Sequence, residues 1–174
     1  MSKFEKEIEI KFKIDDNIIS KLKNLKLEQY EEIDEYFFTK ENVGKNVFLR
    51  FRKKKGKIFL ELKVITLGGE KTRDVYEADE TETEITKGQY ENIKNIFNVI
   101  FPIKMQVRKI RNKGELNDCE IFYDNVDGLG DYLEIEGSKN NIMEICKNFN
   151  IDIEKNRDKE EGYAKMTLKK MELI

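Results

Sequence analysis

The sequence predicts an α+β fold in which antiparallel strands close into a barrel, with charged side chains inside and helices packed outside. The first observation is the segment 7–11, whose charged and apolar side chains alternate and therefore lie on opposite faces of a strand. The second is that these charged faces are sorted by strand, some acidic and others basic. Same-face charges recur along the chain in Arg50 with Arg52, Glu61 with Lys63, Glu80 with Glu82 and Glu84, Lys109 with Arg111, and Glu134 with Glu136.

An open sheet with its charged side in water is the alternative to a barrel. Solvated faces usually mix both signs of charge, whereas most of these faces carry a single sign. Several strands also lead directly into amphipathic helices, which need an apolar sheet surface to cover. We therefore predict that the strands close into a barrel. A barrel of about eight strands leaves room for one small ligand.

After the strand at 7–11, the first part of the chain is predicted to contain one helix and three further strands. Asp15 and Asp16 are residue types that favour an N-cap, and apolar residues at helical spacing predict a helix over 16–29. The lysine-rich segment 53–57 is predicted to be a solvated turn within a hairpin. The strands are predicted over 33–38, 47–52 and 58–65.

A second cycle follows Gly68 and Gly69, which are predicted to lie in a loop. An acidic strand over 80–85 leads into a helix with Thr86 as its N-cap, and Pro102 closes the turn after this helix. This order of acidic strand, helix and further strands repeats that of the N-terminal segment. The sequence therefore predicts an internal twofold repeat.

The last part of the chain is predicted to hold three strands and two helices. The strands cover 104–111, 119–126 and 132–136, with a tight turn at 127–131. Ser138 is expected to cap a helix that reaches Phe149, and the final helix covers 158–171 with Tyr163 and Met166 on its apolar side. No linker divides the chain, so residues 1–174 are predicted to form a single domain.

The composition excludes several classes of site. The charged fraction is 39%, but the formal net charge is only −2, so nucleic acid or a membrane held by overall charge is not expected. The chain has no histidine, and its two cysteines lack metal-type spacing, which excludes the common zinc sites and histidine-based triads. A metal would need carboxylate ligands, which favour Mg²⁺ or Mn²⁺. Without a long apolar run or a disulfide framework, we expect a soluble cytoplasmic protein.

The sorted charges predict a site for a polyphosphate and a metal. Arginine presents a planar fork suited to phosphate oxygens, and lysine adds a point charge. Carboxylates packed together repel one another unless cations lie between them. A polyphosphate held by the basic residues, with divalent cations bridging it to the glutamates, would balance the charges of both the basic and the acidic side chains. The basic candidates are Arg50, Arg52, Lys63, Lys109 and Arg111, and the acidic candidates are Glu7, Glu9, Glu80, Glu82, Glu134 and Glu136, with Asp124 nearby in pattern.

The segment Glu7-Ile8-Glu9-Ile10-Lys11 resembles the ExExK signature of the CYTH superfamily, the triphosphate tunnel metalloenzymes. The resemblance covers nearly the whole chain, and the ordered set of motifs is more specific than ExExK alone. It implies a closed tunnel of eight antiparallel strands that binds triphosphate and Mg²⁺ or Mn²⁺. The other matching segments are Asp34-x-Tyr36-Phe37, Leu49-Arg50-Phe51-Arg52, Lys63, Lys109-x-Arg111 and the stretch from Asp124 through Gly128-Leu129-Gly130-Asp131 to Glu136.

The resemblance also implies roles for individual residues. Glu80 and Glu82 match an acidic pair that holds a second metal or an attacking water, and with Lys63 they form the implied catalytic set; Glu84 is the alternative member of the pair. Arg73 is a poorer match to an arginine that precedes this strand. The implied metal ligands are Glu7, Glu9 and Glu136, with Glu134 and Asp124 as further candidates. The implied phosphate binders are Lys11, Arg50, Arg52, Lys63, Lys109 and Arg111.

The layout is most similar to that of class IV adenylyl cyclase-like bacterial proteins. This similarity implies a phosphorus–oxygen lyase that converts ATP to cyclic AMP and pyrophosphate. Many such cyclases carry Gly-Pro after the lysine, whereas Val64, Ile65 and Thr66 follow Lys63 here. The alternatives are therefore a triphosphatase acting on inorganic, thiamine or nucleoside triphosphate, and a non-catalytic polyphosphate-binding module. The expected partner is a small molecule such as ATP, tripolyphosphate or thiamine triphosphate, and a homodimer is left open.

Overall fold

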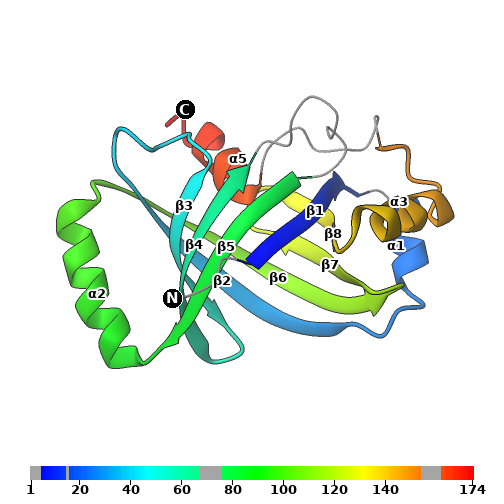
Figure 1. The fold of residues 1–174 in the computed structure, drawn as a ribbon, viewed down its shortest axis with the longest axis horizontal. Helices are drawn as coiled ribbons and strands as arrows, with labels where there is room; N and C mark the ends of the chain where they lie inside the picture. Colours follow the sequence, from blue (N-terminus) through cyan, green and yellow to red (C-terminus); the bar gives the residue numbers. More distant parts are fainter. Residues whose placement is uncertain (1–4, 15, 67–75, 154–161) are drawn as a thin grey trace.

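The computed structural model describes residues 5–14, 16–66, 76–153 and 162–174 (Figure 1). In these ranges, eight antiparallel strands close into a barrel. The strands are β1 (Glu5–Lys13), β2 (Glu28–Phe38), β3 (Val47–Lys54), β4 (Lys57–Thr66), β5 (Tyr76–Ile85), β6 (Ile103–Leu116), β7 (Cys119–Val126) and β8 (Gly130–Glu136). Their order around the barrel is β1-β5-β4-β3-β2-β6-β7-β8. The predicted fold class is confirmed.

Alternation along each strand divides the side chains between the interior and the outer wall. On β1, Glu9 and Lys11 line the interior cavity, whereas Ile10 and Phe12 belong to an apolar cluster under helices. The register between β1 and β8 places Lys11 opposite Glu134. The charged faces of neighbouring strands therefore meet inside the barrel, as the alternation predicted.

Helices cover the outer wall on two sides of the barrel (Figure 1). α1 (Asp16–Leu22) and α3 (Lys139–Asn148) cover one side, where Phe12, Ile121 and Ile145 share an apolar cluster. α2 (Lys87–Ile100) covers the other side, where Tyr90 packs against Phe51. The predicted N-caps are present, since Thr86 forms a capping box with Gln89 and Ser138 accepts a hydrogen bond from the backbone of α3. No helix in the described ranges is long and apolar enough to cross a membrane.

The last described helix, α5 (Tyr163–Lys170), lies across one end of the barrel (Figure 1). Its buried residues Tyr163 and Met166 share an apolar cluster with inward-facing strand residues such as Phe48 and Ile65. This cluster fills the interior at that end. The charged part of the interior therefore lies between α5 and the opposite end of the barrel.

The prediction for residues 16–29 was wrong in its second half. α1 ends at Leu22, and β2 begins at Glu28 because it pairs with β6 along its whole length. This long-range pairing outweighs the local helical spacing. β6 also continues to Leu116, since its second half pairs with β7. The predicted loop at Gly68 and Gly69 and the predicted start of the final helix at 158–161 lie outside the described residues.

Candidate functional site

A charged cavity occupies the interior of the barrel. Its central part has a volume of about 60 Å³, and it continues into a pocket of about 370 Å³ that shares lining residues with it. Glu82 lines this second pocket, and Asp124 is fully buried in the wall. The other predicted site residues line the central part: Glu7, Glu9, Lys11, Arg50, Arg52, Lys63, Glu80, Lys109, Arg111, Glu134 and Glu136. The structure therefore brings residues from seven strands to one place.

Three of the predicted metal ligands form a first carboxylate cluster. Glu7 and Glu9 on β1 and Glu136 on β8 each place one oxygen within 4.8 Å of the others. Burial, together with repulsion from carboxylates such as Glu134 and Glu9, holds the pKa of Glu136 well above its usual range. A set of carboxylate oxygens fits a hard cation such as Mg²⁺ or Mn²⁺, whose charge would relieve this repulsion.

A second carboxylate cluster lies on β4 and β5. Glu61, Glu80 and Glu82 meet the same 4.8 Å criterion, and Glu61 pairs directly with Glu82 across the two strands. Burial raises the pKa of Glu80. Glu84 lies farther along β5, where it accepts a 2.8 Å hydrogen bond from Lys57 at an exposed position. The structure therefore groups Glu80 with Glu82 rather than with Glu84.

The interior arginines are oriented by buried aspartates. Arg52 donates from Nε and Nη2 to the two oxygens of Asp34, at 2.8 and 3.1 Å. Arg111 donates in the same way to Asp124, at 2.8 and 2.6 Å. Arg50 donates to the Tyr36 hydroxyl at 2.8 Å. Such two-point pairing fixes the plane of a guanidinium and so prepares it for a phosphate of matching geometry.

The interior lysines pair with glutamates. The nearest Nζ–oxygen distances are 2.7 Å from Lys11 to Glu134, 2.8 Å from Lys109 to Glu32 and 2.6 Å from Lys63 to Glu7. For Lys11, burial favours the neutral amine, but Glu134 and Glu9 outweigh it and raise the pKa. Glu134 and Asp124 are thus bound to cationic side chains and belong to neither carboxylate cluster. Their role as metal ligands stays a prediction.

The comparison with known families agrees with this geometry. The CYTH domain model matches residues 5–165. The chain belongs to the CYTH family. The resemblance seen in the ExExK segment is confirmed. CYTH proteins are metal-dependent enzymes of adenylyl cyclase or triphosphatase type that act on triphosphate substrates.

Individual relatives support the assignment to the CYTH family. A protein of Methanocaldococcus jannaschii named "Putative adenylate cyclase" is 32% identical over 170 residues, which cover 83% of this chain and 90% of the relative. A conserved hypothetical protein of Pyrococcus furiosus has a TM-score of 0.73 at 26% identity, covering 91% of this chain and 98% of that one. A Hippeastrum adenylyl cyclase-type protein, described as having a dominant triphosphatase activity, shares the fold, with a TM-score of 0.62 at 17% identity and 95% and 96% coverage.

Two buried carboxylates of this CYTH protein had no role in the sequence-based prediction. Glu32 is 1% exposed and pairs with Lys109, and Glu61 is 0% exposed and contacts Arg50 and Arg52. Glu32 fell between the predicted helix and the predicted strand, so its alternation with Asp34 was hidden. Glu61 was visible as a same-face neighbour of Lys63, but such a pair is also common on exposed strands.

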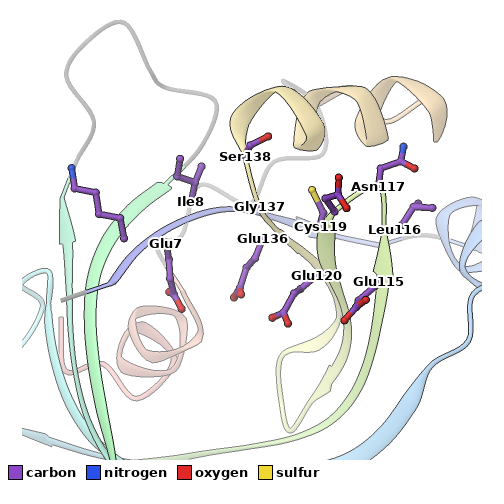
Figure 2. Close-up of a pocket in the computed structure, with 12 residues that line it drawn as sticks. Glu7, Ile8, Glu115, Leu116, Asn117, Cys119, Glu120, Glu136, Gly137 and Ser138 are labelled. Carbon is purple, nitrogen blue, oxygen red and sulfur yellow. The ribbon is translucent and has the colours of Figure 1, made fainter. Parts of the chain in front are cut away.

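A wide groove of about 820 Å³ adjoins the first carboxylate cluster of the CYTH barrel. Figure 2 shows the carboxylates of Glu7, Glu136, Glu120 and Glu115 pointing to the same side, away from Ser138 and α3. The last three lie in register across β8, β7 and β6. Lys6 also lines the groove and Glu120 pairs with Lys113, so the approach to the cluster carries both signs of charge. Arg73, the poorer match among the predicted residues, lies outside the described residues.

Proposed function

We propose that this CYTH protein binds the triphosphate of a small molecule inside its barrel, with Mg²⁺ or Mn²⁺, and cleaves a phosphorus–oxygen bond in it. One observation carries the proposal: two carboxylate clusters adjoin buried arginines and lysines inside one barrel. Carboxylate oxygens suit the cation, and the adjacent cationic groups suit phosphate.

The roles follow from the contacts. One divalent cation would be held by Glu7, Glu9 and Glu136, and a second could be held by Glu61, Glu80 and Glu82. A bound divalent cation would neutralise part of the negative charge of the phosphates. Arg52 and Arg111, fixed by Asp34 and Asp124, would orient the phosphates, and Lys11, Lys63 and Lys109 add positive charge. Positioning and charge neutralisation are what phosphoryl chemistry mainly requires.

The reaction that we assign first is the adenylyl cyclase reaction. The 3′-hydroxyl of ATP would attack the α-phosphorus, the bond from this phosphorus to the bridging oxygen would break, and pyrophosphate would leave. Glu80 is the carboxylate that we assign to accept the hydroxyl proton, because it lines both the central cavity and the adjoining pocket. The pocket of about 370 Å³ beyond the central cavity, lined by Tyr30 and Phe122, offers space and aromatic surface for a nucleoside. The name of the archaeal relative agrees with this assignment.

Hydrolysis of a triphosphate is the second candidate. In this reaction a water molecule attacks the terminal phosphate, and the same residues bind the substrate. The observation in its favour is that β4 continues without interruption through Val64 and Ile65 to Thr66, where many class IV cyclases carry Gly-Pro. The Hippeastrum protein shows that the fold accommodates this activity.

The reaction products distinguish the two candidate reactions. The protein is incubated with ATP, and separately with tripolyphosphate, in the presence of Mg²⁺ or Mn²⁺, and the products are identified by mass spectrometry. Cyclic AMP with pyrophosphate supports the cyclase and excludes hydrolysis as the main reaction. Orthophosphate from tripolyphosphate supports the triphosphatase. Tight binding without turnover would contradict both and indicate a polyphosphate-binding module.

A further inference from the structure

Lys63 has an unusual place among the interior cations, because its ammonium group touches both carboxylate clusters. Its Nζ lies 2.6 Å from Glu7, 2.9 Å from Glu9 and 3.5 Å from Glu80. Glu7 and Glu9 belong to the first cluster and Glu80 to the second. The residue is therefore paired with carboxylates that a divalent cation would need.

A divalent cation bound by the first cluster would approach the same two carboxylates, Glu7 and Glu9, that hold the Lys63 ammonium group. At such short separation two positive charges repel strongly in a buried cavity. Metal binding at this cluster is therefore expected to displace Lys63. The lysine has a flexible four-carbon stem, and it lies in the same cavity as the arginines that we assign to phosphate.

We propose that Lys63 is a resident counter-cation that leaves Glu7 and Glu9 for phosphate when a metal binds. This inference rests on the proposed function, since it takes the metal and triphosphate sites as given. As a consequence, metal and triphosphate strengthen each other's binding by more than the direct contact between them would account for. The metal frees Lys63 for phosphate, and phosphate draws Lys63 away from the metal ligands. By linkage the two effects are equal in size.

Lys109 provides a matched control. It is also a buried lysine of the cavity and an assigned phosphate binder, 3% exposed. Its described partners are Glu32, at 2.8 Å, and Asp124, at 3.8 Å, and neither belongs to a carboxylate cluster. Removing Lys109 changes the net charge of the cavity by the same amount as removing Lys63, but it leaves Glu7 and Glu9 with their partner.

The test measures Mn²⁺ affinity without any phosphate, from the electron paramagnetic resonance signal of free Mn²⁺. Lys63→Met should tighten Mn²⁺ binding about tenfold or more, within the usual range of coupling between sites, whereas Lys109→Met should change it about threefold or less. Both variants should bind tripolyphosphate more weakly. Tripolyphosphate should also enhance Mn²⁺ binding less in Lys63→Met than in the wild type. Equal Mn²⁺ affinities in the two variants would overturn the proposal.

A second measurement needs no charge-removing variant. The ammonium resonance of Lys63 is followed by nitrogen NMR in the wild-type protein and assigned with Lys63→Arg. Saturating Mg²⁺ should shift this resonance, whereas the resonance of Lys109 should move little. An unchanged Lys63 resonance at saturation would contradict the exchange while leaving the metal site intact. If wild-type protein binds no Mn²⁺, or if Glu9→Gln binds it as well as wild type does, the metal site itself fails and the exchange fails with it.

Discussion

The Tyr163 hydroxyl donates a 3.0 Å hydrogen bond to Asp124, and this contact joins α5 to the charged interior of the barrel. The ring of Tyr163 also lies 4.4 Å from the Lys11 ammonium and 5.1 Å from that of Lys109. Burial and the neighbouring Asp124 hold the pKa of Tyr163 well above its usual range, so the hydroxyl remains a donor. The helix that closes the end of the barrel thus also helps to hold the phosphate-binding side chains in place.

Tyr163→Phe tests this connection. The variant keeps the ring but removes the donor to Asp124, so the free energy of unfolding should fall by about 1–3 kcal/mol, measured by urea denaturation. Tyr30→Phe is the control, because the Tyr30 hydroxyl makes no hydrogen bond within the described part of the chain. A Tyr163→Phe variant as stable as this control would show that the bond to Asp124 contributes nothing.

Gly137 is predicted to be intolerant of any side chain. A Cβ at this position would lie 2.5 Å from the Sγ of Cys119 and 3.3 Å from its Cα. Gly137→Ala should therefore lower stability by about 1–3 kcal/mol. Because the sulfur makes the shortest contact, Cys119→Ala should recover part of this loss in the double variant. Simple additivity of Gly137→Ala and Cys119→Ala would argue against the close contact.

Gly88→Ala in α2 is the contrasting substitution. Nothing lies within 4 Å of the position that its Cβ would take, so this variant should be more stable than the wild type by about 0.5–1 kcal/mol.

Glu35 lies on the outer wall, away from the cavity, and we expect it to make the free energy of unfolding depend on pH. Burial would raise its pKa, but hydrogen bonds from Lys53, Lys94 and Tyr90 outweigh burial and lower it. A lowered pKa in the folded state stabilises the protein above the ordinary glutamate pKa of 4.5, and this contribution is lost as the pH falls through the folded-state pKa. Because both lysines are partly exposed, we expect Glu35→Gln to cost only about 1 kcal/mol at neutral pH.

The measurement is urea unfolding of Glu35→Gln and wild type between neutral and acidic pH. The two stabilities should converge as the pH falls below 4.5. A stability difference that stays constant across this range would show that ionised Glu35 is not the cause.

Glu9→Gln tests the first carboxylate cluster. The variant keeps the shape of the side chain but removes one negative charge from Glu7, Glu9 and Glu136, so metal-dependent turnover should fall at least about 10- to 100-fold. The control is Glu31→Gln, whose exposed carboxylate pairs with Arg108. This control should retain wild-type turnover. Full activity in Glu9→Gln would remove the cluster from the mechanism.

The interior of the barrel was largely predictable from strand alternation. Glu7, Glu9 and Lys11 share a face because side chains alternate, and this local rule needs no knowledge of the fold. The sequence could not show that β2 begins at Glu28, because the pairing with β6 joins segments far apart in the chain. The same missing information concealed Glu32, which lies on the part of β2 that was not recognised as strand.

The position of the last helix was also beyond local sequence patterns. The spacing of Tyr163 and Met166 predicts an apolar helix face but not the surface that it covers. The structure places this face against Phe48 and Ile65 at one end of the barrel. Charge pairing was similarly hidden, since Lys63 and Glu7 are far apart in sequence and meet only when β1 and β4 enter the same barrel.

The most direct test of the central claim is a crystal structure of the protein with tripolyphosphate and Mn²⁺, using the anomalous signal of manganese. We predict a manganese peak between Glu7, Glu9 and Glu136, with phosphate oxygens bound by Arg52, Arg111 and their neighbouring lysines inside the barrel. A manganese peak outside this cluster, or tripolyphosphate bound only on the outer surface, would contradict the account.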